Sequence, residues 1–198
     1  MVIMRLKTPI AVSDVRKLRV GDTLYVTGTL VLARDEGHMR LLEFHEEGKQ
    51  PPTPLEGMVL YHCGPVVKKN GKWEVVAAGP TTSTRMEIFE DKVIENYGIR
   101  VIIGKGGMGE KTTEAMKEYG AVYGAFVGGA AVLAAKAIKE VKDVAWLDLG
   151  TPEAFWILEV EDFGPLMIAI DTHGNNLFLD VKKKIAENKE KVYKKLGV

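Results

Sequence analysis

The residues best suited to chemistry lie in one short range, Gly79–Arg85, where an apolar run with strand character ends and a helical pattern begins. Thr81, Thr82 and Ser83 place three hydroxyl groups directly after a Gly-Pro pair, and Arg85 adds a guanidinium. A helix that opens directly after a strand leaves backbone N–H groups unpaired in its first turn. Together these donors would bind a small carboxylate or phosphate. The alternative is that the hydroxyls only cap the helix and that Arg85 pairs with a surface acid.

A second candidate is the glycine-rich turn Gly104–Gly109, which follows a short apolar strand, precedes a helix and contains Lys105. It satisfies the pattern G-x-G-x-x-G. A dinucleotide site would also need an acidic residue about 20 positions later to hold the ribose, and the chain has Val127–Ala130 there. We therefore interpret it as a second anion-binding turn, in which backbone N–H groups and the Lys105 ammonium meet a carboxylate. A stand-alone nucleotide- or anion-binding module is the alternative.

A third cationic group lies nearer the N-terminus. The periodicity predicts a helix over Val31–Glu47, which carries Arg34, Asp35 and His38. Arg34 and His38 would share a face of that helix and could point at one site. Paired cationic anchors suit a dicarboxylate, with hydroxyls between them for proton chemistry. A hydroxyl is a poor base without a metal or a partner, and the sequence supplies no set of metal ligands. The residues alone thus predict a small-anion site that lacks its cofactor.

Composition limits the function further. A length of 198 residues is ample for one domain core, and a formal net charge of zero argues against a nucleic-acid binder. No apolar run approaches a membrane span, and the start of the chain lacks a secretory signal. The single cysteine, Cys63, excludes an internal disulfide framework and predicts a reducing, cytoplasmic setting. It also cannot supply the thiolates of an iron–sulfur or zinc site. Abundant Lys and Glu hint at a thermophilic source.

The elements that must position these residues alternate between strands and helices. Strands are expected over Met1–Thr8, Thr23–Leu30, Met58–Val67, Lys72–Ala78, Arg100–Ile103, Ala121–Val127, Asp143–Leu149, Phe155–Glu161 and Leu166–Ile170. Helices are expected over Asp14–Leu18 with Ser13 as cap, Val31–Glu47, the stretch after Met86, Glu110–Tyr119, Gly128–Glu140 and Leu179–Leu196. Asn70-Gly71 predicts a hairpin, and Gly48–Gly57 is the one true loop. Since no repeat or domain boundary is evident, we expect a single α/β domain over residues 1–198, with a mixed sheet and flanking helices.

Several motifs follow one another in the order found in one enzyme family. They are Thr27-Gly28-Thr29, Ala33-Arg34-Asp35 with His38, Gly64-Pro65-Val66, Ala78–Ser83 with Arg85-Met86, Gly104–Met108, Gly164-Pro165 and Asp171–Phe178. With these motifs, which cover nearly the whole chain, the sequence closely resembles the β subunit, or C-terminal domain, of the class I fumarase and L(+)-tartrate dehydratase family of iron–sulfur hydro-lyases.

The resemblance implies a swivelling β/β/α domain that works with a separate α subunit. That α subunit would carry a [4Fe–4S] cluster, the expected assembly would be α2β2, and the active site would lie between the subunits. The implied reaction is reversible hydration of fumarate to L-malate. The alternative substrate is L(+)-tartrate or a methylated dicarboxylate, which the sequence does not separate from fumarate because part of the pocket would come from the other chain. The chain by itself would be inactive.

Residue roles are also carried over from the resemblance. Thr81 is expected to handle the proton at carbon, with Ser83 as its hydrogen-bonding neighbour. Arg34 and Arg85 are expected to clamp carboxylates, and Lys105 to add a further cationic contact. Supporting roles are expected for Asp35, His38 and Thr82, and a turn or interface role for His173. A third class of function, a non-catalytic assembly or regulatory subunit, is the remaining hypothesis.

Overall fold

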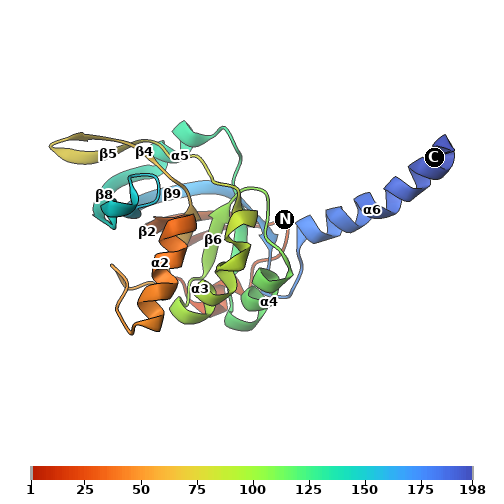
Figure 1. The fold of residues 1–198 in the computed structure, drawn as a ribbon, viewed down its shortest axis with the longest axis horizontal. Helices are drawn as coiled ribbons and strands as arrows, with labels where there is room; N and C mark the ends of the chain where they lie inside the picture. Colours follow the sequence, from red (N-terminus) through yellow and green to blue (C-terminus); the bar gives the residue numbers. More distant parts are fainter. Residues whose placement is uncertain (1, 198) are drawn as a thin grey trace.

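The computed structural model describes residues 2–197, apart from the side chain of Glu190 (Figure 1). The strands are β1 Ile3–Lys7, β2 Thr23–Ala33, β3 Val59–His62, β4 Val66–Asn70, β5 Lys72–Ala77, β6 Val101–Gly104, β7 Val122–Ala125, β8 Ile138–Ala145 and β9 Phe155–Ile170. The α-helices are α1 Val12–Val15, α2 Asp35–Glu46, α3 Glu90–Tyr97, α4 Glu110–Tyr119, α5 Ala131–Ala137 and α6 Leu177–Leu196, and two 3-10 helices are η1 Ser83–Ile88 and η2 Leu147–Leu149.

The main sheet is mixed and is organised by its two longest strands, β2 and β9. One edge of β2 pairs in parallel first with β1 and then with β3, while its other edge pairs antiparallel with β9. β9 pairs in turn with β7 and β8. Because β3, β6 and β7 are also joined in parallel, the pairings from β2 through β3, β6, β7 and β9 return to β2 and close a ring. The predicted α/β class with a mixed sheet and flanking helices is confirmed.

The short strands β3 and β6 are buried on both faces. In β3, Val59 and Tyr61 belong to one hydrophobic cluster, whereas Leu60 belongs to a second cluster. The second cluster includes Leu41 of α2 and Val93 of α3, so it fills the layer between the sheet and the helices. Figure 1 shows α2, α3 and α4 together over the sheet, with α5 and the hairpin β4–β5 above them. Strands with two buried faces read as continuous apolar runs rather than alternating ones.

Helix α6 is different, because it extends away from the body of the molecule (Figure 1). Its exposed apolar side chains include Val181, Ile185, Val192 and Leu196. No helix in the described part of the chain is both long enough and apolar enough to cross a membrane.

Several predicted elements are confirmed. The hairpin at Asn70-Gly71 joins β4 and β5, the helix over Glu110–Tyr119 is α4, and Gly48–Gly57 contains no regular element. The predicted first strand is β1 at the edge of the sheet, while Met1 lies outside the described residues.

Three predictions in the N-terminal half are wrong. The helix expected from Val31 begins only at Asp35, because residues 31–33 continue β2, where β3 and β9 supply hydrogen-bonding partners on both edges. The strand expected over Met58–Val67 is two strands, β3 in the main sheet and β4 in the hairpin. Ser13 is also not a cap, since α1 begins after Ala11.

Three further predictions fail around β9. The helix expected over Gly128–Glu140 is shortened to α5, because the chain from Ile138 pairs with β9 as strand β8. The strand expected over Asp143–Leu149 ends at Ala145, before η2. The two strands expected on either side of Gly164-Pro165 are one 16-residue strand. It bends through irregular pairing with β2, and Asp162 has a φ of 47°. A long partner strand can thus hold a chain extended through residues that usually break a strand.

Candidate functional site

The predicted site residues meet at the carboxyl ends of three parallel strands. Asp35 follows β2, Lys105 follows β6, and the hydroxyl turn Thr81–Ser83 is held against β3. The Thr81 N–H donates to the carbonyl of His62, the last residue of β3, over 2.7 Å. An isolated parallel bridge pairs Thr82 with Lys105. Ligands bind outside the carboxyl ends of parallel strands both in open α/β sheets and in closed barrels, so this is the expected edge for a site.

The hydroxyl turn opens into a short 3-10 helix rather than an α-helix. Thr82 precedes that helix in an extended conformation and makes no side-chain cap. The Ser83 N–H donates to the Lys105 carbonyl over 2.8 Å. Two of the backbone donors predicted to bind an anion are therefore used inside the chain. The hydroxyls of Thr81 and Thr82 are half-buried and make no hydrogen bond to residues 2–197, so they are available to a ligand.

Arg85 and Asp35 form a two-pronged ion pair. The guanidinium Nε donates to Asp35 Oδ1 over 3.0 Å, and Nη2 bonds to Oδ2. Burial would raise the pKa of Asp35, but the hydrogen bond and charge of Arg85 outweigh it and lower that pKa. The Arg85 side chain is 50% exposed, so its remaining N–H groups face solvent or a partner. Asp35 thus holds the guanidinium of Arg85 by two contacts.

Arg34 and His38 do not point at one site, contrary to the prediction. Arg34 is the residue before α2, and its guanidinium lies beside Asp35 and Glu153, whereas the His38 ring lies against Glu90. The Nε of Arg34 is 2.5 Å from Glu153 Oε1 and 3.8 Å from Asp35 Oδ2. The contact with Glu153 is close but lacks hydrogen-bond alignment. His38 is buried, and its Nδ1 lies 2.8 Å from the Arg34 carbonyl oxygen.

The glycine-rich turn binds a carboxylate of its own chain. Glu87 accepts hydrogen bonds from the Gly109 N–H over 2.5 Å and from the Thr112 N–H over 3.3 Å. It also accepts from the Thr112 hydroxyl over 2.8 Å. The Gly109 N–H of the turn is therefore not available to a ligand, and neither is the Lys105 N–H, which donates to the Thr81 carbonyl over 3.3 Å. Lys105 is exposed and forms no ion pair with any described residue, so its ammonium is free for a ligand.

Ser83 lies below the turn rather than on its surface. Its side chain is fully buried, and its Oγ is 2.9 Å from both His62 Nδ1 and the Tyr123 hydroxyl. None of the sequence motifs singles out His62, Tyr123 or Glu90 for chemistry. A buried Glu90 at the start of α3 was the available signal, since an acid among apolar residues needs a partner.

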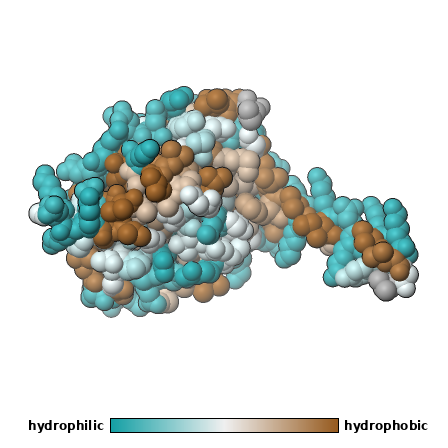
Figure 2. Space-filling model, turned by 90° about the horizontal axis from the view of Figure 1, so that it is seen from above, coloured by the Kyte–Doolittle hydropathy of each residue, from teal (hydrophilic) through white to brown (hydrophobic). Residues whose placement is uncertain are grey.

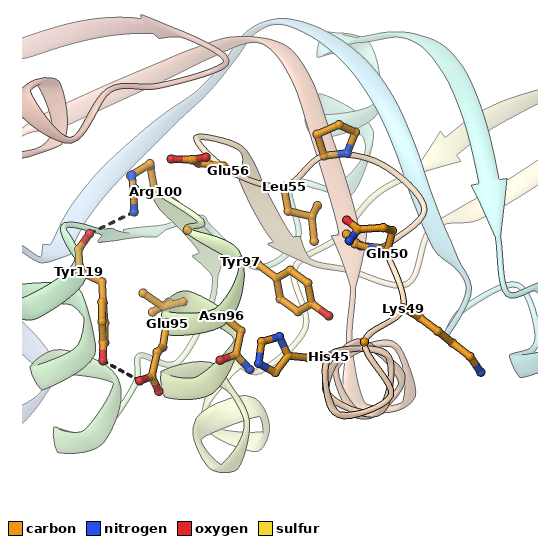
Figure 3. Close-up of a pocket in the computed structure, with 15 residues that line it drawn as sticks. His45, Lys49, Gln50, Leu55, Glu56, Glu95, Asn96, Tyr97, Arg100 and Tyr119 are labelled. Carbon is orange, nitrogen blue, oxygen red and sulfur yellow. Dashed lines mark hydrogen bonds between the residues drawn. The ribbon is translucent and has the colours of Figure 1, made fainter.

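A well-formed pocket lies elsewhere in the chain. Its volume is about 640 Å³, and residues near the amino end of β6 and the last turns of α2, α3 and α4 line it (Figure 3). Figure 3 shows Arg100 bonded to the Tyr119 carbonyl and Tyr119 bonded to Glu95. None of the predicted site residues lines this pocket. His173 is also remote from the predicted site, because its Nε2 lies 3.1 Å from the Arg16 carbonyl oxygen.

The surface beside the hydroxyl turn is apolar in several places. Gly79 at the start of the turn lies against Ala131 of α5, and Gly128 lies against Lys105. Exposed apolar side chains on the surrounding elements are Val66, Val76, Ile88, Val127, Val132 and Leu133. Figure 2 looks down on the end of the molecule that carries α5 and the hairpin, and shows apolar patches among polar groups. The free hydroxyls and Lys105 therefore lie on an open surface with apolar neighbours.

Comparison with known proteins supports the resemblance seen in the motifs. The family described as "Fumarase C-terminus" matches residues 1–181. The L(+)-tartrate dehydratase subunit beta of Escherichia coli (strain K12) is 47% identical over 193 residues, which are 96% of this chain and 94% of that protein. A putative L(+)-tartrate dehydratase subunit beta of Methanocaldococcus jannaschii is 45% identical over 88% of this chain and 90% of its own length. A putative fumarate hydratase class I of Geobacillus stearothermophilus is 43% identical over 96% of this chain but only 37% of its own length. The chain therefore belongs to the fumarase C-terminus family.

Proposed function

We propose that this chain is the β subunit of a hydro-lyase that adds or removes water on a small dicarboxylate. L(+)-tartrate is the substrate that its relatives favour, because two relatives of nearly equal length carry that name. Fumarate, the first expectation from sequence, is supported by a less similar and longer relative. We therefore place L(+)-tartrate first and fumarate second.

The observation that carries the proposal is the grouping of cations and free hydroxyls at one edge of the sheet. Arg85 and Lys105 would each bind a substrate carboxylate, since both are exposed and a charge-assisted hydrogen bond to a carboxylate is strong. Asp35 holds the Arg85 guanidinium in place. Thr81 lies on the turn between these cations, with its hydroxyl available to hold or pass a proton at the substrate carbon. Arg34, engaged with Glu153, would contribute by packing beside the clamp.

The open surface around these groups supports a second subunit. A site that must exclude water needs walls, and the apolar side chains beside the hydroxyl turn would be covered by another chain. The putative fumarate hydratase of G. stearothermophilus contains a region like this chain within a longer protein. We propose that a separate α subunit supplies the remainder here, in an α2β2 assembly. The swivelling β/β/α architecture and the single domain over residues 1–198 belong to the same proposal.

The donor set of this chain does not fit an iron–sulfur cluster. Such clusters are held by several thiolates, and the sequence contains one cysteine. Cys63 is fully buried, and burial raises its pKa to about 12, so it stays a thiol. We propose that the [4Fe–4S] cluster belongs to the α subunit, and that this chain contributes binding, orientation and a hydroxyl group.

The test is anaerobic purification of the tagged chain from its native host. We expect an iron-containing partner chain to co-purify, and we expect the complex to dehydrate L(+)-tartrate faster than it hydrates fumarate. A complex active on fumarate alone would support the hydro-lyase assignment but would refute the choice of L(+)-tartrate over fumarate as the substrate. A chain that purifies alone, without iron and without lyase activity, would refute the proposal, and saturable nucleotide binding by that chain would favour the nucleotide-module alternative.

A further inference from the structure

Beneath the hydroxyl turn, a row of buried polar side chains runs through five different elements. All of its members are fully buried, and they come from β7, η1, β3, α3 and α2 in that order. The members are Tyr123, Ser83, His62, Glu90 and His38. Buried polar networks cost stability unless every member is satisfied, so the arrangement of protons in this row can be worked out from its contacts.

The charged end of the row contains Glu90 and His38. His38 Nδ1 is 2.8 Å from the Arg34 carbonyl oxygen, which only accepts, so that nitrogen carries a proton. Glu90 Oε2 is 3.2 Å from His38 Nε2 and 2.7 Å from His62 Nε2. Two proton arrangements satisfy both contacts: a carboxylate that accepts from both nitrogens, or a protonated Oε2 that donates to His38 and accepts from His62. The pKa directions of Glu90 and His38 select the first arrangement, in which Glu90 is an anion and His38 is a cation protonated on both nitrogens.

The neutral end of the row begins at His62. Its Nε2 proton faces Glu90, so its Nδ1 is free to accept from the Ser83 hydroxyl over 2.9 Å. The Ser83 oxygen then accepts from the Tyr123 hydroxyl over 2.9 Å. A second proton on His62 would leave an uncompensated positive charge in the core. The row thus contains one anion, one cation and three neutral groups.

The pKa directions agree with this assignment. Burial would raise the pKa of Glu90, but the neighbouring His62 and His38 lower it to about 2. Burial would lower the pKa of His38, but the charge and hydrogen bond of Glu90 raise it. Burial lowers the pKa of His62, which keeps it neutral.

The row ends at both halves of the proposed site. One end is the Arg34 carbonyl, immediately before Asp35 and α2. Toward its other end, the main chain of two members holds the hydroxyl turn, because the His62 carbonyl accepts from the Thr81 N–H and the Ser83 N–H donates to the Lys105 carbonyl. A shift of any member of the row would therefore move the hydroxyl turn relative to Arg34 and the start of α2.

Gly104 leaves the space that the row requires. A Cβ added there would overlap Ser83 Oγ and would lie 3.2 Å from His62 Nδ1. The φ of Gly104 is not positive, so an alanine would be strained by this overlap and not by its own backbone. Gly104→Ala is therefore a local wedge between Ser83 and His62.

We propose that His62, Glu90 and Tyr123 are positioning residues of the hydro-lyase site. They fix the Ser83 hydroxyl as a donor to His62, and in this way they hold the hydroxyl turn in place relative to Arg34 and the start of α2. This inference rests on the proposed function. It assigns roles to three residues that are fully buried.

The first test measures the protons directly. In ¹⁵N-histidine NMR spectra of the full chain near pH 7, assigned with His38→Gln and His62→Gln, we expect His38 to be doubly protonated. We expect His62 to be neutral with its proton on Nε2. A cationic His62, or a neutral His62 with its proton on Nδ1, would overturn the inference, because Ser83 could then not donate to it. This spectrum requires no turnover, so its outcome is independent of the proposed function.

The second test uses the assembled complex and a rescue. We expect Gly104→Ala to lower kcat roughly 100-fold and Ser83→Ala or Tyr123→Phe to lower it about tenfold, with KM nearly unchanged. The double variant Gly104→Ala with Ser83→Ala should recover to the level of Ser83→Ala alone, because the overlapping oxygen is gone. His45→Gln, exposed in the remote pocket, is the matched control.

The outcomes of the second test separate the two proposals. A wild-type complex without lyase activity would refute the proposed function. In an active complex, unchanged kcat in both Ser83→Ala and Tyr123→Phe would refute this inference. Failure of the double variant to recover would refute it as well, since the wedge would then act through something other than Ser83.

Discussion

Replacing Glu90 by glutamine should strongly destabilise the folded chain. Glu90 is fully buried and its Oε2 faces His62 and His38, while its Oε1 has no partner in the described chain. Removing one member of a buried ion pair costs about 3–5 kcal/mol, because the remaining charge is left uncompensated. The pKa of Glu90, lowered from 4.5 to about 2, corresponds to about 3 kcal/mol by linkage. The two routes agree, so we expect a loss of about 3 kcal/mol.

The sign of the pH dependence follows from the same groups. Because the folded pKa of Glu90 is depressed, its contribution is present above pH 4.5 and is lost as the pH falls toward 2. The pKa of His38 is raised, so its contribution is present below pH 6.5 and is lost as the pH rises through its folded value. The pair of Glu90 and His38 should therefore stabilise the folded chain most in the mildly acidic range between pH 4.5 and pH 6.5.

Urea unfolding of the full chain near pH 6 measures the predicted loss. The matched control is Glu95→Gln, in the same helix but on the surface, which should change the unfolding free energy little. A double variant, Glu90→Gln with His38→Gln, should recover part of the loss because no unpaired charge remains. If Glu90→Gln were no more destabilising than Glu95→Gln, the assignment of an ionised Glu90 would be wrong.

Three further predictions concern the Glu87 carboxylate that caps α4 by accepting from its first N–H groups, the Arg85 clamp and the Cys63 thiol. Gly109→Ala should lower the free energy of unfolding by about 1 kcal/mol, because its Cβ would lie 2.6 Å from Glu87 Oε1 and displace the capping carboxylate. An unchanged midpoint in a urea titration would contradict this. Arg85→Ala should lower kcat/KM of the complex by about 10- to 100-fold, and equal activity would remove Arg85 from the clamp. Cys63 should resist thiol reagents in the folded chain near pH 8 and react after unfolding, because it is buried with a pKa of about 12. Rapid labelling of the native chain would contradict this.

The local sequence pattern predicted an element correctly where the contacts of that segment in the fold favour the same structure. Helix α4 was predictable over Glu110–Tyr119 because its apolar spacing and flanking glycines all indicate a helix. The end of β2 was not, since residues 31–33 have helical spacing but gain strand partners on both edges. The single strand β9 was hidden by Gly164-Pro165, which breaks a strand only where no long partner holds it.

For the candidate site as well, the sequence predicts some features and misses others. That Thr81, Arg85 and Lys105 meet at one edge follows from strand-end positions, which sequence reasoning can use. The partners of these side chains do not follow. Asp35 binds Arg85 across 50 positions, and Glu87 caps Gly109 across 22. Such pairs depend on how helices pack on the sheet, so the sequence predicted free donors where the chain had already used them.

The most direct test of the central claim is turnover of L(+)-tartrate and fumarate by the anaerobically purified complex carrying Thr81→Ala. The Thr81 hydroxyl makes no hydrogen bond within residues 2–197, so its removal should leave folding and assembly intact. Loss of a proton-transferring group should lower kcat by about 10²- to 10⁴-fold on the preferred substrate. An intact Thr81→Ala complex with full turnover would contradict the catalytic assignment and would favour a role for this chain in assembly or regulation.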